Sequence, residues 1–187
     1  MAPVFVITGP SGAGKGTLIR ALVERLPELE LAVSATTREI RPGEAEGVDY
    51  WFVSNEEFER RVAAGEFLEH VTYVSGRCYG TLVSEVERIA ARGKVCVLEL
   101  ETEGALEVHE RLPGAVTIFI SAPIEELERR LRARATESDG EIEERVGLAR
   151  SQLQQADRFD YVIENDELEH AVAELERVVR RELADRG

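Results

Sequence analysis

Apolar residues follow two patterns that alternate along the chain. Four short, nearly continuous apolar runs, at residues 4–7, 95–100, 116–120 and 161–163, predict buried strands. Between and after these runs, apolar residues return every three or four positions, which predicts helices. Apolar strands that alternate with helices are typical of a parallel sheet covered on both faces. The expected fold class is therefore α/β.

Residues 34–81 interrupt this alternation. Two short predicted strands, near 50–53 and 67–74, lie close together in the sequence. The helix between them begins with a capping box at 54–57, and a second capping box at 138–141 marks the start of a long helix. We predict that residues 34–81 form an insertion with its own small sheet.

The first predicted strand leads into the sequence GPSGAGKGT at residues 9–17, which a helix follows. The pattern G-x-x-x-x-G-K between a strand and a helix predicts a P-loop, whose backbone N–H groups surround an oligophosphate. A bound anion also explains why Lys15 stands at a helix N-terminus, where the macrodipole disfavours cations. Gly16 occupies the position of the hydroxyl that usually holds Mg²⁺, and Thr17 is the nearest replacement. The stretch therefore predicts a nucleotide site.

Composition and charge limit the other ligands. The 187 residues include 23 basic and 37 acidic side chains, a net charge of −14, which argues against a nucleic-acid-binding surface. The two cysteines and three histidines have neither disulfide nor metal-site spacing. No apolar run has the ~18 residues of a membrane span, and no signal peptide is evident. We expect a cytoplasmic protein with small-molecule ligands, no nucleic acid, no membrane and no obligate protein partner.

Arg38 and Arg41 lie on or beside a loop in the insertion, which also contains Tyr50 and Tyr79. Guanidinium and phenol groups together are suited to a second phosphate group. Spacing alone favours a solvated turn. The P-loop upstream favours the phosphate interpretation, because a transferase needs a second anion site.

Three acidic residues lie at predicted strand ends. Glu69 follows Phe67 and Leu68, and Glu99 and Glu101 alternate with leucines, so both carboxylates point to one side. A strand-end carboxylate can support Mg²⁺ opposite a P-loop. It can also accept hydrogen bonds from the adjacent N1–H and N2–H₂ donors of guanine. Ordinary surface acids explain the same pattern.

In their order along the chain, these motifs resemble guanylate kinase. The resemblance rests on residues 9–17, 34–44, 47–50, 65–69, 79–81, 98–101, 130–134, Arg145 and 165–166, and so covers nearly the whole chain. It implies transfer of the γ-phosphoryl group of ATP to GMP (or dGMP), with Mg²⁺.

The resemblance also implies roles for individual residues. It assigns ATP binding to Gly9, Pro10, Ser11, Gly12, Ala13, Gly14, Lys15, Gly16, Thr17, Arg130, Arg134 and Asn165. It assigns GMP binding to Ser34, Arg38, Arg41, Tyr50, Glu69, Tyr79, Thr81, Glu99 and Glu101, with guanine read by Ser34, Glu69, Thr81 and Glu101. It assigns catalysis to Lys15, Arg41, Arg134 and Arg145, and Mg²⁺ to Thr17 and Glu99.

The implied architecture is a P-loop NTPase-type core (1–33, 82–123 and 159–187), a mixed α/β GMP-binding insertion (34–81) and a helical lid (124–158). The sequence departs from the family pattern at Gly16, at Glu99 and Glu101, where many relatives have aspartate, and at Glu103, where glutamine is usual. Two alternatives stay open: a kinase for another nucleoside monophosphate, and a non-catalytic guanylate-kinase-like interaction module. A GTPase is disfavoured because the sequence contains no N-K-x-D motif.

Overall fold

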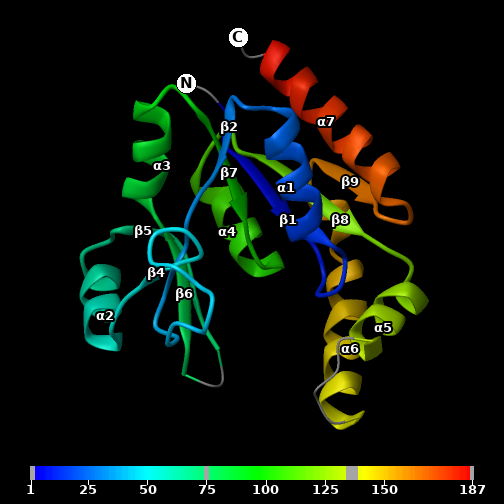
Figure 1. The fold of residues 1–187 in the computed structure, drawn as a ribbon, viewed down its shortest axis with the longest axis horizontal. Coiled ribbons are helices and arrows are strands. Elements are labelled where there is room, and N and C mark those ends of the chain that lie inside the picture. Colours follow the sequence, from blue (N-terminus) through cyan, green and yellow to red (C-terminus); the bar gives the residue numbers. More distant parts are fainter. Residues whose placement is uncertain (1–2, 74–75, 134–138, 186–187) are drawn as a thin grey trace.

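The protein was analysed as a computed structural model, which describes residues 3–73, 76–133 and 139–185. Its central element is a parallel sheet with the strand order β2-β7-β1-β8-β9 (Figure 1). The strands are β1 (Phe5–Thr8), β2 (Leu29–Leu31), β7 (Val95–Glu99), β8 (Val116–Ser121) and β9 (Tyr161–Glu164). The predicted α/β class with a parallel sheet is confirmed.

Helices cover both faces of this sheet. They are α1 (Lys15–Arg25), α3 (Val83–Ala91), α4 (Thr102–Arg111), α5 (Ile124–Ala133), α6 (Asp139–Leu153) and α7 (Leu168–Asp185). Because successive strand side chains point to opposite faces, Phe5 and Ile7 pack with α1 and α7 in one core, whereas Val6 packs with α3 and α4 in another. Among the described residues, no helix is both long and apolar enough to cross a bilayer.

A second sheet is formed by strands between residues 35 and 82. Its strand order is β4-β3-β6-β5, and α2 (Asn55–Ala63) packs beside it (Figure 1). The strands are β3 (Ala35–Thr36), β4 (Trp51–Phe52), β5 (Phe67–Thr72) and β6 (Cys78–Leu82). The N-cap half of the predicted capping box is present, since Ser54 Oγ accepts a hydrogen bond from Glu57 N at 3.1 Å, whereas the Glu57 carboxylate accepts from Arg60 and Arg61. In the second predicted capping box, Ser138 lies outside the described residues, and the side chain of Glu141 is not described.

Strand β6 has no clear signal in the sequence. Gly80 stands in its middle, and glycine weakens a strand pattern. The pairing with β5 requires this glycine, because a Cβ at Gly80 would lie 2.7 Å from the Glu69 backbone oxygen. Gly80 therefore allows close strand pairing but interrupts the apolar alternation from which a strand is predicted.

The chain passes between the two sheets near Val33 and again at the start of α3. The buried Glu85 carboxylate joins the two crossings, because it accepts hydrogen bonds from Val33 N at 3.0 Å and from Arg88. In Figure 1 the second sheet with α2 lies on one side below the central sheet, and α5 and α6 lie on the other. The carboxyl ends of β1 and β7 face the space between them, where ligands of open α/β sheets bind.

Candidate active site

The glycine-rich loop connects β1 to α1. Gly12 and Gly14 have φ of 88° and 86°, in the left-handed region that favours glycine. Gly9 packs against β8 so closely that a Cβ there would lie 2.1 Å from Ile120 O. Gly14 is the N-cap of α1 and provides no side-chain acceptor, so the first N–H groups of the helix remain available to an anion.

The Lys15 ammonium lies over this loop. Its Nζ donates hydrogen bonds to Gly9 O at 2.6 Å and to Pro10 O at 3.3 Å. Burial lowers the pKa of Lys15, whereas the charges of Glu101 and Glu99 raise it. A cation held among backbone amides is suited to the charge of an oligophosphate.

Residues expected to bind ATP or to act in catalysis also contact the loop. The buried Asn165 donates from Nδ2 to Ala13 O at 2.7 Å. Arg130 donates to Gly12 O at 3.2 Å and to Asn165 O at 3.1 Å, and its Nε donates to Glu126. Arg145 donates to Ser11 Oγ at 2.8 Å. The loop is therefore contacted by side chains from α5, from α6 and from the segment that follows β9.

Replacing Asn165 by alanine is expected to lower the free energy of unfolding by about 1–3 kcal/mol, because the buried Ala13 carbonyl loses its donor. The freed loop should also bind ATP less tightly. Urea unfolding and ATP titration measure the two effects. Glu164→Gln, at an exposed position on β9, is the control and should leave both unchanged. Unchanged stability and ATP affinity in Asn165→Ala would contradict the supporting role.

One cavity of about 930 Å³ joins the loop, the second sheet and α6. Of the residues singled out in the sequence, it is lined by Lys15, Ser34, Arg41, Tyr50, Glu69, Tyr79, Glu99, Glu101 and Arg145. Thr17, Arg38, Thr81, Arg130 and Asn165 are not among its lining residues. Arg134 lies outside the described residues. The cavity thus brings the lysine of the loop and the polar groups of the insertion into one space.

Arg38 is buried and already engaged by a carboxylate. Its guanidinium donates to the two oxygens of Glu44 at 2.9 and 2.7 Å, and it stacks over the Tyr50 ring. This pair raises the pKa of Arg38 and lowers that of Glu44, with Tyr79 beside Arg38 adding to the effect on Arg38. Sequence reading did not identify Glu44. Arg41, by contrast, is exposed and lines the cavity, and its backbone N–H donates to Glu44 at 2.8 Å.

Glu69 is a buried carboxylate, with 4% of its surface exposed. Burial raises its pKa, and the hydroxyl and backbone N–H of Thr81 partly oppose that shift. The Thr81 hydroxyl is itself fully buried and, within the described ranges, meets no partner at ordinary hydrogen-bond distance and angle. The Glu69 carboxylate and the Thr81 hydroxyl, on adjacent strands, are therefore buried together, and Glu69 also lines the cavity.

Glu99 faces the loop. Its side chain is partly exposed, but desolvation by the surrounding residues raises its pKa, Lys15 lowers it and Glu101 raises it. A Cβ at Gly16 would lie 3.8 Å from both Glu99 oxygens, so the missing side chain leaves space between loop and carboxylate. No three His, Cys, Asp or Glu of the described residues meet as a metal site. One carboxylate still fits Mg²⁺, which usually takes one or two carboxylates together with phosphate oxygens and water.

Several cavity-lining residues were not predicted. Tyr73, Arg77 and Asp49 line the cavity from the insertion, and Leu148, Ser151, Gln152 and Gln155 line it from α6 and the turn after it. The spacing of three or four residues on α6 is a helical signal that extends from Arg145 and could have indicated this face. Gln152 is buried, and its Oε1 has no partner among the described residues.

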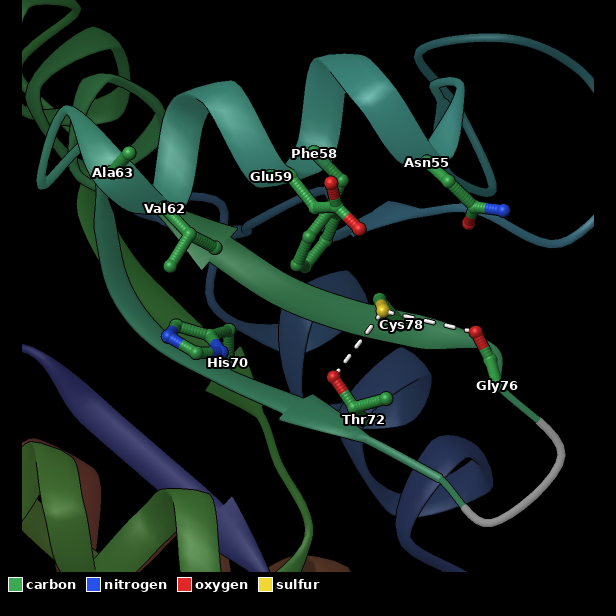
Figure 2. A pocket seen from close by; sticks show the side chains of 9 residues that line it. All are labelled: Asn55, Phe58, Glu59, Val62, Ala63, His70, Thr72, Gly76 and Cys78. Carbon is green, nitrogen blue, oxygen red and sulfur yellow. Dashed lines mark hydrogen bonds between the residues drawn. The ribbon is translucent and has the colours of Figure 1, made fainter.

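A second cavity, of about 420 Å³, lies between α2 and strands β5 and β6 (Figure 2). It is lined by Asn55, Phe58, Glu59, Val62, Ala63, His70, Thr72, Gly76 and Cys78. Along β5 and just beyond it, Glu69, Val71 and Tyr73 line the large cavity, whereas His70 and Thr72 line this one, as alternate strand residues should. None of the predicted site residues lines it.

A parallel sheet whose first strand passes through a glycine loop and a lysine into a helix defines a P-loop protein. A guanylate kinase family profile matches residues 1–182. Guanylate kinases of Symbiobacterium thermophilum and Rubrobacter xylanophilus are each 46% identical over 182 residues, 97% of this chain and 86% and 95% of theirs. The chain belongs to the guanylate kinase family.

Solved structures agree with this assignment. The crystal structure of guanylate kinase from Anaplasma phagocytophilum superposes with a TM-score of 0.77 at 32% identity, over 97% of this chain and 86% of that one. Shikimate kinase from Bacteroides thetaiotaomicron shares the fold alone, with a TM-score of 0.53 at 19% identity over 96% of this chain and 99% of that one.

Proposed function

We propose that this protein transfers the γ-phosphoryl group of ATP to GMP, giving ADP and GDP. The observation that carries the proposal is the single cavity that Lys15 of the glycine loop shares with Arg41 and Glu69 of the insertion. ATP binds at the loop, with Lys15 at its β- and γ-phosphates. The GMP phosphate binds Arg41, Tyr50 and Tyr79. Arg38 also contacts the phosphate once part of the Arg38 guanidinium is released from Glu44.

The chemistry of the buried acids supports guanine as the base. Glu69 can accept hydrogen bonds from the N1–H and N2–H₂ donors of guanine, whereas adenine has an acceptor at N1. Thr81 supplies a buried hydroxyl beside it, and Ser34 and Glu101 complete the proposed set. A polar site built for particular donors rejects bases that lack them, because its buried groups are then left unpaired.

The reaction needs positioning and charge rather than a general base. The acceptor is a phosphate oxygen that is largely ionised at neutral pH, since its second pKa is near 6. Lys15, Arg41 and Arg145 surround the cavity and offset the repulsion between the two anions. Mg²⁺, held through Glu99 with Thr17 nearby, would neutralise charge on the β- and γ-phosphates. Glu103 adds a negative charge to the cavity lining, which weakens anion binding there.

These roles divide the chain into three functional parts. We assign ATP to a core of residues 1–33, 82–123 and 159–187, GMP to the insertion 34–81, and closure over the phosphates to a lid of residues 124–158. Arg130 and Arg145 of this lid already contact the glycine loop. Closure excludes water, which would otherwise hydrolyse ATP, and such motions occur in μs to ms.

A four-nucleotide assay tests the function. ADP formation from ATP is followed with GMP, AMP, UMP or CMP as the acceptor. We expect turnover with GMP and little with the others. A preference for AMP, UMP or CMP would identify a kinase for that nucleotide. Calorimetric titration with ATP–Mg²⁺ then separates an inactive enzyme from an interaction module, because only the module should fail to bind the nucleotide.

Glu69 gives the proposal a pH dependence. Burial raises its pKa above the ordinary value of 4.5, so the carboxylate is protonated as the pH falls through that raised value. The apparent affinity for GMP should then fall, because the protonated group is a poorer acceptor for two guanine donors. Calorimetric titration with GMP at a series of pH values measures this loss of affinity at acidic pH.

The matched variant is Glu69→Gln. It should bind GMP weakly and lack the loss of affinity at acidic pH that Glu69 causes. The GMP phosphate titrates in both proteins and cancels in the comparison. An identical pH profile in both proteins would exclude Glu69 as the source.

A further inference from the structure

Gly104 is a buried glycine in the first turn of α4, and its backbone conformation does not require glycine. Its φ is not positive, unlike that of the glycines in the loop or in the turns. Alanine is the better helix former at such a position, because glycine loses more backbone entropy on folding. Glycine at residue 104 therefore costs helix stability, and a packing or functional reason must offset that cost.

The space that Gly104 leaves is occupied by one side chain of the insertion. A Cβ at this position would lie 2.8 Å from Glu69 Oε2, 3.4 Å from Glu69 Cδ and 3.7 Å from Glu69 Cγ. All three nearest atoms belong to the same side chain, so the glycine makes room for the Glu69 carboxylate. Contacts between α4 and β5 connect the core with the second sheet here.

We propose that Gly104 is a positioning residue for base recognition, because it fixes where the Glu69 carboxylate stands. This role rests on the proposed function. Helix α4 of the core would set the position of Glu69, the base-recognising side chain of the insertion. The carboxylate lies against the first turn of α4, where no side chain caps the helix. The positive end of the helix dipole there acts against the burial that raises the pKa of Glu69.

An added methyl group would have a specific consequence. The carboxylate is the free end of a side chain that lines the large cavity, so it can yield by moving into that cavity. The strand pairing of β5 with β6 need not change. The displaced carboxylate would then occupy part of the volume of the base and lose its alignment with the two guanine donors.

The test is Gly104→Ala in steady-state kinetics with GMP and ATP varied separately. We expect the KM for GMP to rise by about 10- to 100-fold, because hydrogen bonds from guanine to a charged acceptor are lost. The KM for ATP and kcat at saturating GMP should stay within about threefold, and the urea midpoint should not fall. The preference for GMP over IMP, which lacks the 2-amino donor, should shrink.

Two further variants show whether the effect passes through Glu69. Glu110→Ala is the control, since Glu110 is exposed in the same helix α4 and does not line the large cavity. It should leave both KM values unchanged. In a Glu69→Ala background the room for the added methyl group is restored, so Gly104→Ala should add nothing to the KM for GMP.

Three results would overturn the inference: an unchanged KM for GMP, equal losses for GMP and ATP, or a GMP loss that persists in the Glu69→Ala background. The last would indicate a displaced α4 rather than a displaced carboxylate. Failure of the proposed function is a separate result, because the unmodified protein would then not phosphorylate GMP at all.

Discussion

Replacing Lys15 by methionine is expected to lower kcat by about 10³-fold or more while the protein remains folded. Methionine keeps an unbranched chain of similar length but removes the ammonium that spans Gly9 O and Pro10 O. In the reaction that ammonium would leave the carbonyls and follow the charge that develops on the transferring group. A contact of equal strength in the ground state and the transition state would change KM alone. Measuring kcat and KM separately therefore shows whether Lys15 acts on the transition state.

Lys94→Met is the matched control, since Lys94 is the other lysine of the sequence and also donates to a backbone carbonyl, that of Pro27. It lies outside the cavity lining. Single-turnover kinetics give the chemical step, and circular dichroism with urea unfolding reports the fold. Near-normal turnover in Lys15→Met would contradict the assignment of the loop to the donor phosphates.

Replacing Arg41 by methionine is expected to weaken GMP by about 10- to 100-fold, or about 1.5–3 kcal/mol, with little change in ATP affinity. Arg41 is exposed and lines the cavity, so the substitution removes the proposed phosphate ligand without disturbing a core. Arg38 is the poorer target, because its removal would also leave the Glu44 carboxylate without its ion pair. Calorimetric titrations with GMP and with ATP measure the two affinities separately.

The control for Arg41 is Arg111→Met, an exposed arginine at the end of α4 that pairs with Glu107. It should change neither affinity. Equal weakening of GMP and ATP in Arg41→Met would show that the insertion is not the acceptor side of the cavity.

Local patterns carried most of the fold prediction. The glycine loop could be read directly, because its chemistry depends on backbone conformation and on one lysine within a single short stretch of sequence. The N-cap at Ser54 is equally local, and its hydrogen bond to Glu57 N is present. Strand β6 was missed because its central glycine serves a contact with β5 rather than an apolar face.

Contacts between distant segments could not be read in the same way. The Arg130 and Asn165 side chains reach the loop across 118 and 152 residues of sequence, so their supporting contacts appear only in three dimensions. The pair of Arg38 with Glu44 is close in sequence, but many acids stand near arginines in this chain. Gly104 likewise looks like an ordinary helix residue until Glu69 is placed beside it.

The central claim, that the cavity joins a donor loop to a GMP acceptor, is tested most directly by following the γ-phosphoryl group itself. ATP labelled in that group is incubated with the protein, GMP and Mg²⁺, and the products are separated by chromatography. The label should appear in GDP in a ratio of about one to the ADP formed, with little inorganic phosphate, as transfer between two bound nucleotides requires. Label recovered as inorganic phosphate, or left in ATP despite bound nucleotide, would contradict the account.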